Sequence, residues 1–361
     1  MQVSRNLLPD LAPSGLDHYE LLLTLKQHFK SACFDDHNQL IYPCASDYAL
    51  KVRWKDGRAT HIHPGPRFSS TDFENLNIRI QTDLVECPGM AIGSEILFSS
   101  PHPLHGHFRT DQLQLLPAPP DAPTPDETHA DHPFVLEFAF PRSINNAITR
   151  KRRVRLSLEW AWILNALLRT TIKCQEPRVK RLWVYCKHEQ NPMHSHFTNG
   201  SYIYSGSSGL ADEFTHPTTP PITQIGRDEY YDTEYLRGGD VLILPDSLPQ
   251  MLSIVDRLTP ADRRWFLRAA RWVSVARELW DYHVSSYYIA LVAGIESLMN
   301  AESPPRCDKC KQVTGITRRF RAFVERYSTG SGRDKTVNAR LYAIRSELAH
   351  GEYLFDIDES P

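Results

Sequence analysis

Apolar residues recur at helical spacing along the last quarter of the chain. Between Thr259 and His350 the apolar positions repeat every three or four residues, which is the period of a helix with one buried face. Thr259 begins this region with a capping hydroxyl, a proline at the next position and an early acid. The pattern predicts an all-α bundle with short connections, built from helices at approximately 260–280, 282–300, 314–328 and 334–350.

Before Thr259 the pattern changes to short β-prone stretches between turn-rich segments. A first helix is expected near Ser14, with Ser14 and Asp17 as its cap, and a strongly apolar helix over 156–172. No regular βαβ alternation is visible, which favours an α+β region over 1–258, with α/β as the alternative. The predicted strands are 40–42, 50–54, 76–80, 95–98, 134–140, 179–186 and 241–244.

Residues 116–133 interrupt this region with a run rich in proline and acidic residues. The run offers almost nothing to bury, so it predicts an exposed loop rather than a packed element. The sequence therefore predicts two parts, an α+β sensor or regulatory region over 1–258 and a helical bundle over 259–361.

The composition indicates the cellular compartment in which the protein is expected. The 361 residues contain no apolar run near the roughly 20 residues that span a membrane, so no membrane partner is expected. The first residues lack the features of a signal peptide, which predicts a cytoplasmic protein. Seven cysteines scattered over a long chain do not suggest a disulfide framework, and reduced thiols are expected.

The charge is unevenly distributed along the chain. Residues 259–351 hold 16 Lys and Arg against 9 Asp and Glu, whereas residues 1–258 hold 25 basic residues against 30 acidic ones. A basic module next to an acidic one is typical of a domain that binds a polyanion such as RNA. The alternative is that the arginine-rich helices simply have solvated faces.

The last predicted helix carries the most specific pattern. Its apolar residues face the core at spacings of four, three and four, while Arg345 and Ser346 lie off that stripe. His350 follows one turn after Ser346, and Gly351 then ends the helix.

This region resembles the HEPN domain family, and its Apea-like branch in particular. Arg345-Ser346-Glu347-Leu348-Ala349-His350 matches the Arg-x4–6-His motif of that family, and Tyr342 and Gly351 match the wider pattern. The segment 294–299, which contains Glu296, resembles the second helix of the branch. The resemblance covers about the last 100 residues, and residues 1–258 resemble no family that we recognise.

The resemblance implies an endoribonuclease that needs no metal and no cofactor. The 2′-OH of RNA would attack the neighbouring phosphate and leave a cyclic phosphate and a free 5′-OH. His350 would transfer protons, and the fork of Arg345 would stabilise the charged phosphorane. Ser346 would bind the phosphate or orient His350, and Glu296 would orient Arg345.

The family also implies a homodimer through the helical bundle, with RNA as the substrate. A role in antiphage defence or as a toxin follows by the same resemblance, with a phage-derived trigger or a regulatory partner. The alternative is a non-catalytic HEPN module that binds a nucleotide or a protein. The further candidate RNA contacts are Arg340, Tyr342, Arg318, Arg319, Arg150, Lys151, Arg152 and Arg153.

Metal sites are the weakest candidates. Cys307 and Cys310 form one CxxC pair, which is half of a zinc site, and two thiols on a surface loop is the alternative. Several histidines also have metal-compatible spacing, although the default interpretation is that they are loop histidines without a metal: His61/His63, His102/His105/His107 and His194/His196.

Overall fold

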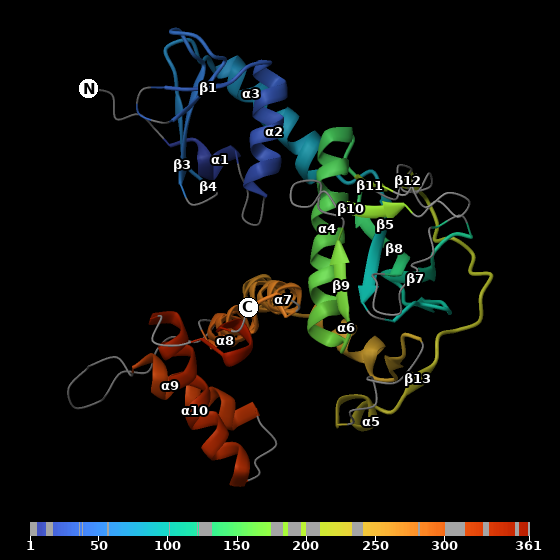
Figure 1. Ribbon diagram of the computed structural model, residues 1–361. Coiled ribbons are helices and arrows are strands. Elements are labelled where there is room, and N and C mark those ends of the chain that lie inside the picture. Colours follow the sequence, from blue (N-terminus) through green and yellow to red (C-terminus); the bar gives the residue numbers. More distant parts are fainter. Residues whose placement is uncertain are drawn as a thin grey trace. The chain divides into compact units, whose positions relative to one another are not determined.

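The chain is seen here in a computed structural model (Figure 1). The structure describes residues 6–11, 17–35, 37, 39–55, 58–100, 102–120, 122, 132–174, 183–186, 196–199, 210–232, 241–280, 282–299, 315–327, 332–350 and 354–359. These residues form a mixed helix-and-sheet protein with several helices near its C-terminal end. Contacts divide it into two compact units: unit 1 comprises 1–93, 139–156 and 210–213, and unit 2 comprises 94–138, 157–209 and 214–361.

Unit 1 is an antiparallel sheet covered by helices. Its four strands lie in the order β1-β2-β3-β4, and α2 and α3 pack against them (Figure 1). Leu21 and Leu25 of α2, Val52 of β3 and Leu76 of α3 are buried in one shared core. The elements are α1 (Leu8–Leu11), α2 (His18–Phe29), β1 (Cys33–Phe34), β2 (Leu40–Tyr42), β3 (Leu50–Lys55), β4 (Arg58–Pro64), α3 (Ser70–Ile80) and a π-helical turn (Gln81–Val85).

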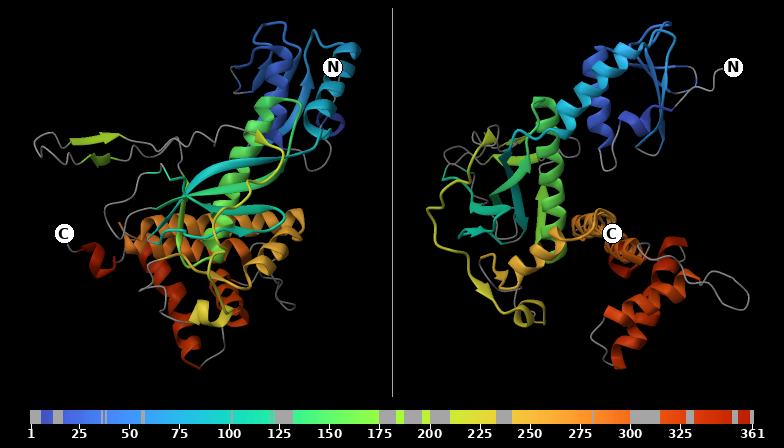
Figure 2. Two further views of the ribbon diagram at one scale, coloured as in Figure 1. Left: turned by 90° about the vertical axis from the view of Figure 1, so that its right-hand side faces the viewer. Right: turned by 180° about the vertical axis from the view of Figure 1, so that it is seen from behind.

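A second sheet has the strand order β12-β5-β8-β7-β6, with β9 also paired to β5. Helix α4 runs alongside this sheet in every view (Figures 1 and 2). The residues of β5, β8 and α4 are shared between the two units. The elements are β5 (Met90–Ser100), β6 (Phe108–Arg109), β7 (Leu113–Pro117), β8 (His132–Pro141), α4 (Asn146–Leu167), β9 (Thr171–Cys174) and β12 (Leu210–Ala211).

The remaining elements belong to unit 2. Helices α7 and α8 lie side by side, and α9 and α10 both pack against α8 (Figure 2). The elements are β10 (Trp183–Cys186), β11 (His196–Asn199), β13 (Gln224–Ile225), α5 (Arg227–Asp232), β14 (Leu244–Pro245), α6 (Leu248–Asp256), α7 (Pro260–Leu279), α8 (Val284–Met299), α9 (Ile316–Tyr327), α10 (Gly332–His350) and α11 (Asp356–Glu359).

Three predicted elements need correction. Of the strand expected at 241–244, only Leu244 lies in a strand, β14. Residues 76–80 are the end of α3 rather than a strand, because Ser69 and Asp72 form a capping box that starts a helix there. The apolar helix expected over 156–172 begins ten residues earlier, at Asn146, and ends at Leu167, where the chain turns into β9. In the expected loop at 116–133 the ends belong to β7 and β8, and 121 and 123–131 lie outside the described residues.

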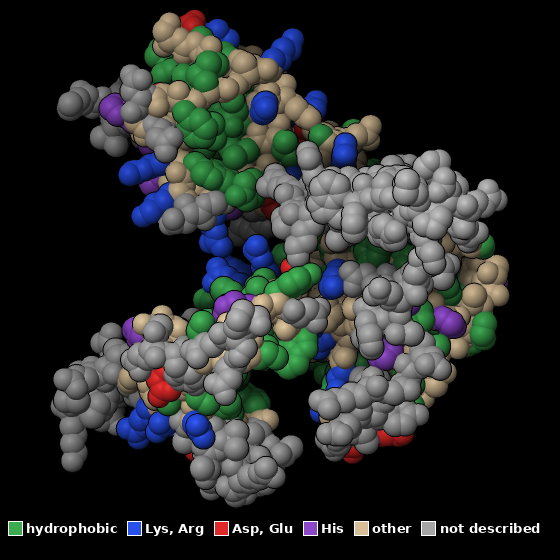
Figure 3. Space-filling view, viewed as in Figure 1, with side chains coloured by type: hydrophobic (Ala, Val, Ile, Leu, Met, Phe, Trp, Pro, Cys, Tyr) green, Lys and Arg blue, Asp and Glu red, His purple; other side chains and the backbone are tan. Residues whose placement is uncertain are grey.

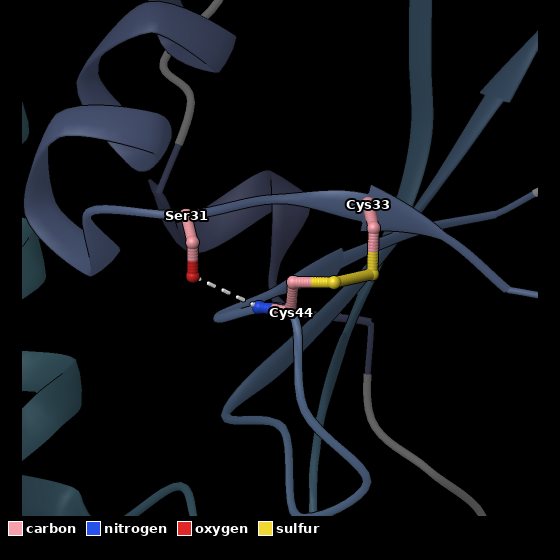
Figure 4. The surroundings of a disulfide bond; sticks show 3 residues. All are labelled: Ser31, Cys33 and Cys44. Atoms are coloured by element: carbon pink, nitrogen blue, oxygen red, sulfur yellow. Dashed lines mark hydrogen bonds between the residues drawn. A yellow bond between two sulfur atoms is a disulfide. The ribbon is translucent and has the colours of Figure 1, made fainter.

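The expectation of reduced thiols is wrong for one pair of cysteines. Cys33 of β1 and Cys44, which follows β2, form a disulfide (Figure 4). The backbone N–H of Cys44 also donates a hydrogen bond to the hydroxyl of Ser31 at 3.1 Å. Since β1 and β2 are hydrogen-bonded neighbours, their pairing brings the two thiols together, which the spacing along the sequence does not reveal.

The division between the units differs from the predicted boundary at 258/259. Helix α7 packs against β9, and the guanidinium of Arg277 donates hydrogen bonds to the backbone carbonyls of Leu168 and Thr170. Burial lowers the pKa of Arg277 from its usual value. These contacts join the C-terminal helices to the α4–β9 connection, so both belong to unit 2. No helix in the described ranges is long and apolar enough to cross a membrane.

Candidate functional site

The candidate site lies on α8 and α10, which a small apolar core holds together. Val292 and Met299 of α8, Phe320 of α9 and Tyr342 of α10 are buried against one another. The hydroxyl of Tyr288 on α8 donates a hydrogen bond to the backbone carbonyl of Leu341 on α10 at 2.6 Å. The register between the two helices is therefore set both by packing and by a polar contact.

Glu296 of α8 and Arg345 of α10 meet above this core in an ion pair. Nη2 of Arg345 lies 3.3 Å from Oε2 of Glu296, and both side chains are half-buried. The guanidinium carbon of Arg345 lies 5.8 Å from the ring centroid of Tyr342. Nε of Arg345 is buried and has no hydrogen-bond partner among the residues that the structure describes. Arg345 is thus oriented by one carboxylate and one ring.

Tyr342 lies between Arg345 and the apolar core instead of facing solvent. It is buried, and its ring packs 5.0 Å from that of Phe320. Burial raises the pKa of the Tyr342 hydroxyl, and the negative charge of Glu296 raises it further. The expected RNA contact of Tyr342 is not supported by this placement, because the ring already forms part of the core.

His350 and Ser346 lie elsewhere on α10. His350 is the last residue of the helix and is exposed, and Ser346 is half-buried. On a regular helix, positions 345 and 350 are about 140° apart around the axis, and positions 346 and 350 about 40°. Within the described ranges no hydrogen bond or ion pair joins His350 to Arg345, Ser346 or Glu296. The structure therefore brings Arg345 and Glu296 together, and it leaves His350 apart from them in a single chain.

The basic residues of the C-terminal helices that were expected to contact RNA differ in their exposure to solvent. Arg318 and Arg340 are exposed. Arg319 is half-buried and donates a hydrogen bond to the backbone carbonyl of Met299 at 2.8 Å. In the view of Figure 3 the basic side chains over α9 and α10 form a larger patch than the acidic ones.

The basic run at 150–153 lies inside α4, in unit 1. Arg150 is exposed, Arg153 is half-buried, and Nζ of Lys151 lies 4.6 Å from the ring centroid of Tyr19. Arg152 is buried, and its Nη2 lies 2.9 Å from a carboxylate oxygen of Glu20. The expected RNA contact of Arg152 does not fit this placement, because its guanidinium is already occupied inside the protein.

The described residues give little support to the candidate metal ligands. Cys307, Cys310 and His194 lie outside the described residues, and the side chain of His196 is not described. The rings of His61 and His63 stack at 5.6 Å, and Nδ1 of His107 lies 2.6 Å from the carbonyl oxygen of Thr219. Within the described residues, no group of three His, Cys, Asp or Glu side chains is arranged to hold a metal ion.

Comparison with known proteins identifies no relative of this chain. No protein-family model matches the chain, and no curated protein and no solved structure matches it either.

Proposed function

We propose that the protein is a metal-independent RNA endonuclease of the HEPN type. The observation that carries this proposal is the ion pair between Glu296 and Arg345. It joins the two helices on which the family pattern places its acid and its arginine, and it holds the guanidinium in place near the end of α10. A guanidinium fixed in this way is suited to a phosphate whose negative charge increases during reaction.

The proposed reaction is a transesterification within the RNA. A base removes the proton of the 2′-OH while the 2′-oxygen forms a bond to phosphorus. The bond from phosphorus to the 5′-oxygen breaks, and an acid protonates that oxygen. The products are a 2′,3′-cyclic phosphate and a 5′-OH end. His350 is the proposed proton-transfer group, and Arg345 stabilises the phosphorane.

Two copies of the chain are proposed to share one site. Arg345 and His350 project from different sides of α10, so one chain presents them poorly to a single phosphate. A second α10 facing the first would add the partner subunit's His350. With two histidines at the site, one can act as the acid and the other as the base. A homodimer through the helical bundle meets this need. We propose a role in antiphage defence or as a toxin, with residues 1–258 sensing a trigger or restraining the nuclease.

The second candidate is a non-catalytic module that binds a nucleotide or a protein. One observation favours it: Arg345 is already paired with Glu296, and His350 is not in contact with that pair. Such a module would recognise phosphate through Arg345 and leave RNA intact.

Cleavage by purified protein tests the two candidates. Wild type, Arg345→Ala and His350→Ala are incubated with RNA at high protein concentration in EDTA. His216→Ala serves as the matched control, because His216 is also exposed and in unit 2. The nuclease proposal expects cleavage by wild type and His216→Ala alone, with no cleavage of DNA.

The product ends give a second readout. Fragments should carry 5′-OH ends that a polynucleotide kinase labels directly, and cyclic phosphates that block ligation until they are opened. Normal RNA affinity in His350→Ala, together with an absence of cleavage by every protein including wild type, would favour the binding module. Cleavage that EDTA abolishes would contradict the proposed chemistry.

A further inference from the structure

Helix α7 carries three exposed arginines on one side. Arg264, Arg268 and Arg271 follow at spacings of four and three. On a regular helix these positions fall within about 60° around the axis and span roughly 10 Å along it. No ion pair joins any of them to a carboxylate among the residues with described positions. We call these three residues the α7 arginine stripe.

The other arginines of α7 are engaged inside the protein. Arg263 lies 3.4 Å from a carboxylate oxygen of Glu159 on α4, and Arg277 donates to backbone carbonyls. The arginine stripe is therefore a distinct set of charges that no carboxylate among the described residues neutralises. Like charges one turn apart on a helix repel one another and destabilise it, so the stripe is better explained by an external ligand than by folding.

Two of the three stripe arginines pack on tryptophan rings. The guanidinium carbon of Arg268 lies 4.7 Å from the ring centroid of Trp265, and that of Arg271 lies 5.4 Å from the ring of Trp162 on α4. A guanidinium stacked on an aromatic face keeps its N–H groups free at the edge, where they can bind phosphate oxygens. Arg268 and Arg271 are therefore ordered before any ligand arrives, which reduces the entropy cost of binding.

An exposed aromatic ring lies beside the stripe. Trp272 is 41% exposed, and its position on the helix falls between the stripe and the side that packs on α8, where its Cβ approaches Gly294. Basic side chains that follow a phosphate backbone, next to a ring on which a base can stack, are the usual elements of a single-stranded nucleic-acid surface.

We infer that the α7 arginine stripe and Trp272 bind single-stranded RNA outside the Arg345 site. The choice of RNA rests on the proposed function, since this surface would hold the substrate of that nuclease. A membrane surface fits less well, because the apolar residues of α7, such as Ala269 and Ala276, are buried and leave no broad apolar face to insert.

The test measures RNA binding separately from cleavage. The full chain with His350→Ala is titrated against a fluorescent 20-nucleotide oligouridylate at several salt concentrations. A variant with Arg264→Gln, Arg268→Gln and Arg271→Gln is compared with an equally neutralised control. The control carries Arg53→Gln, Arg227→Gln and Arg257→Gln, three exposed arginines outside the stripe.

Loss of three phosphate contacts should lower the salt slope of log K by about 2, and weaken binding about 10- to 100-fold at moderate salt. The control should bind like the parent. Arg264→Glu alone should also weaken binding, and it serves if the triple variant does not fold. Equal binding by the stripe variant and the control would overturn the inference. The same variants are also titrated against vesicles that contain phosphatidylserine. If the stripe variant binds only these vesicles less tightly, and binds RNA normally, the surface is a membrane surface and the inference is overturned.

Cleavage by the stripe variant in an otherwise wild-type chain separates the two proposals. Arg345 and His350 remain, so KM should rise while kcat is kept. If no protein cleaves RNA but the stripe variant still binds less tightly than the control, this inference stands and the nuclease proposal fails. If wild type cleaves and the stripe variant binds normally, the nuclease proposal stands alone.

Discussion

Asp358 accepts a hydrogen bond from the backbone N–H of Ser285 at 2.6 Å, although the two residues are 73 positions apart. Its other carboxylate oxygen accepts the N–H of Val284 at 2.8 Å, and the N–H of Phe355 donates to the hydroxyl of Ser285 at 2.9 Å. A carboxylate from the end of the chain therefore caps the first turn of α8. The cap fixes the start of the helix that carries Glu296.

Replacing Asp358 by Asn should lower the melting temperature by about 2–4 °C, because the first N–H groups of α8 lose a charged acceptor. The measurement is thermal unfolding followed by circular dichroism. Glu278→Gln is the control, since Glu278 is exposed on α7. An equal change in both variants would show that only net charge matters.

The effect of Asp358 should depend on pH. Burial alone would raise the pKa of Asp358, but its hydrogen bonds with Ser285 and Val284 outweigh burial and hold the pKa below the usual value of 3.8. A carboxylate with a lowered pKa in the folded state stabilises the protein above its unfolded pKa. The difference between wild type and Asp358→Asn should thus be full near neutral pH and disappear as the pH falls well below 3.8.

Glu20 and Arg152 form a buried ion pair whose rupture should be costly. Their side chains are 4% and 9% exposed. Glu20→Gln leaves the charge of Arg152 buried without its partner and should lower the free energy of unfolding by about 3–5 kcal/mol. Denaturation in urea measures this loss. Asp212→Asn, which breaks the exposed pair with Arg142, should cost less than about 1 kcal/mol.

The double variant Glu20→Leu, Arg152→Met separates loss of charge from loss of packing. Removing both charges should restore most of the stability, because no charge is left buried alone. A double variant as unstable as Glu20→Gln would contradict this account.

The Cys33–Cys44 disulfide should stabilise unit 1 under oxidising conditions. Its residues are 11 positions apart, and closing a loop of this length contributes about 3 kcal/mol. The variant with Cys33→Ser and Cys44→Ser should lose this amount, and wild type in reductant should match it. Cys87→Ser is the control, since Cys87 is an exposed free thiol. Wild type that does not respond to reductant would show that the pair is not bonded.

Arg345→Lys should reduce cleavage about 100-fold while RNA affinity changes little, because lysine keeps the charge and loses the fork. Glu296→Gln should reduce cleavage less, since Glu296 positions Arg345. If Glu296 acts through Arg345, adding Glu296→Gln to Arg345→Lys should cause no further loss. Single-turnover rates measure these effects. Arg257→Lys is the control, because Arg257 is exposed in unit 2 and is not among the candidate RNA contacts, and an equal loss there would remove Arg345 from the site.

The C-terminal helices could be predicted closely because their signal is local. Apolar periodicity and the cap at Thr259 placed all four helices within a few residues of α7, α8, α9 and α10. The capping box at Ser69 and Asp72 is equally local, and it would have identified α3 had it been weighed against the β-prone residues 76–80.

Other features depend on residues far apart in the sequence. The start of α4 was missed because the run 150–153 is strongly basic and precedes the apolar stretch, whereas Arg152 has its partner 132 positions earlier, in Glu20. The ion pair of Glu296 with Arg345 was expected from the family pattern and is present. The relation of His350 to that pair remains a prediction, since a second copy of the chain would decide it.

The discontinuous make-up of unit 1 has a consequence for its synthesis on the ribosome. Its three stretches end at Gly93, Leu156 and Glu213, so the last of them emerges 120 residues after the first. At 5–20 residues per second this delay is roughly 6 to 24 s. During part of it Glu20 waits for Arg152, which has not yet been made. A ribosome stalled before Arg152 would hold a nascent chain in which Glu20 lacks its charge partner, and proteases and chaperones could reach the incomplete unit.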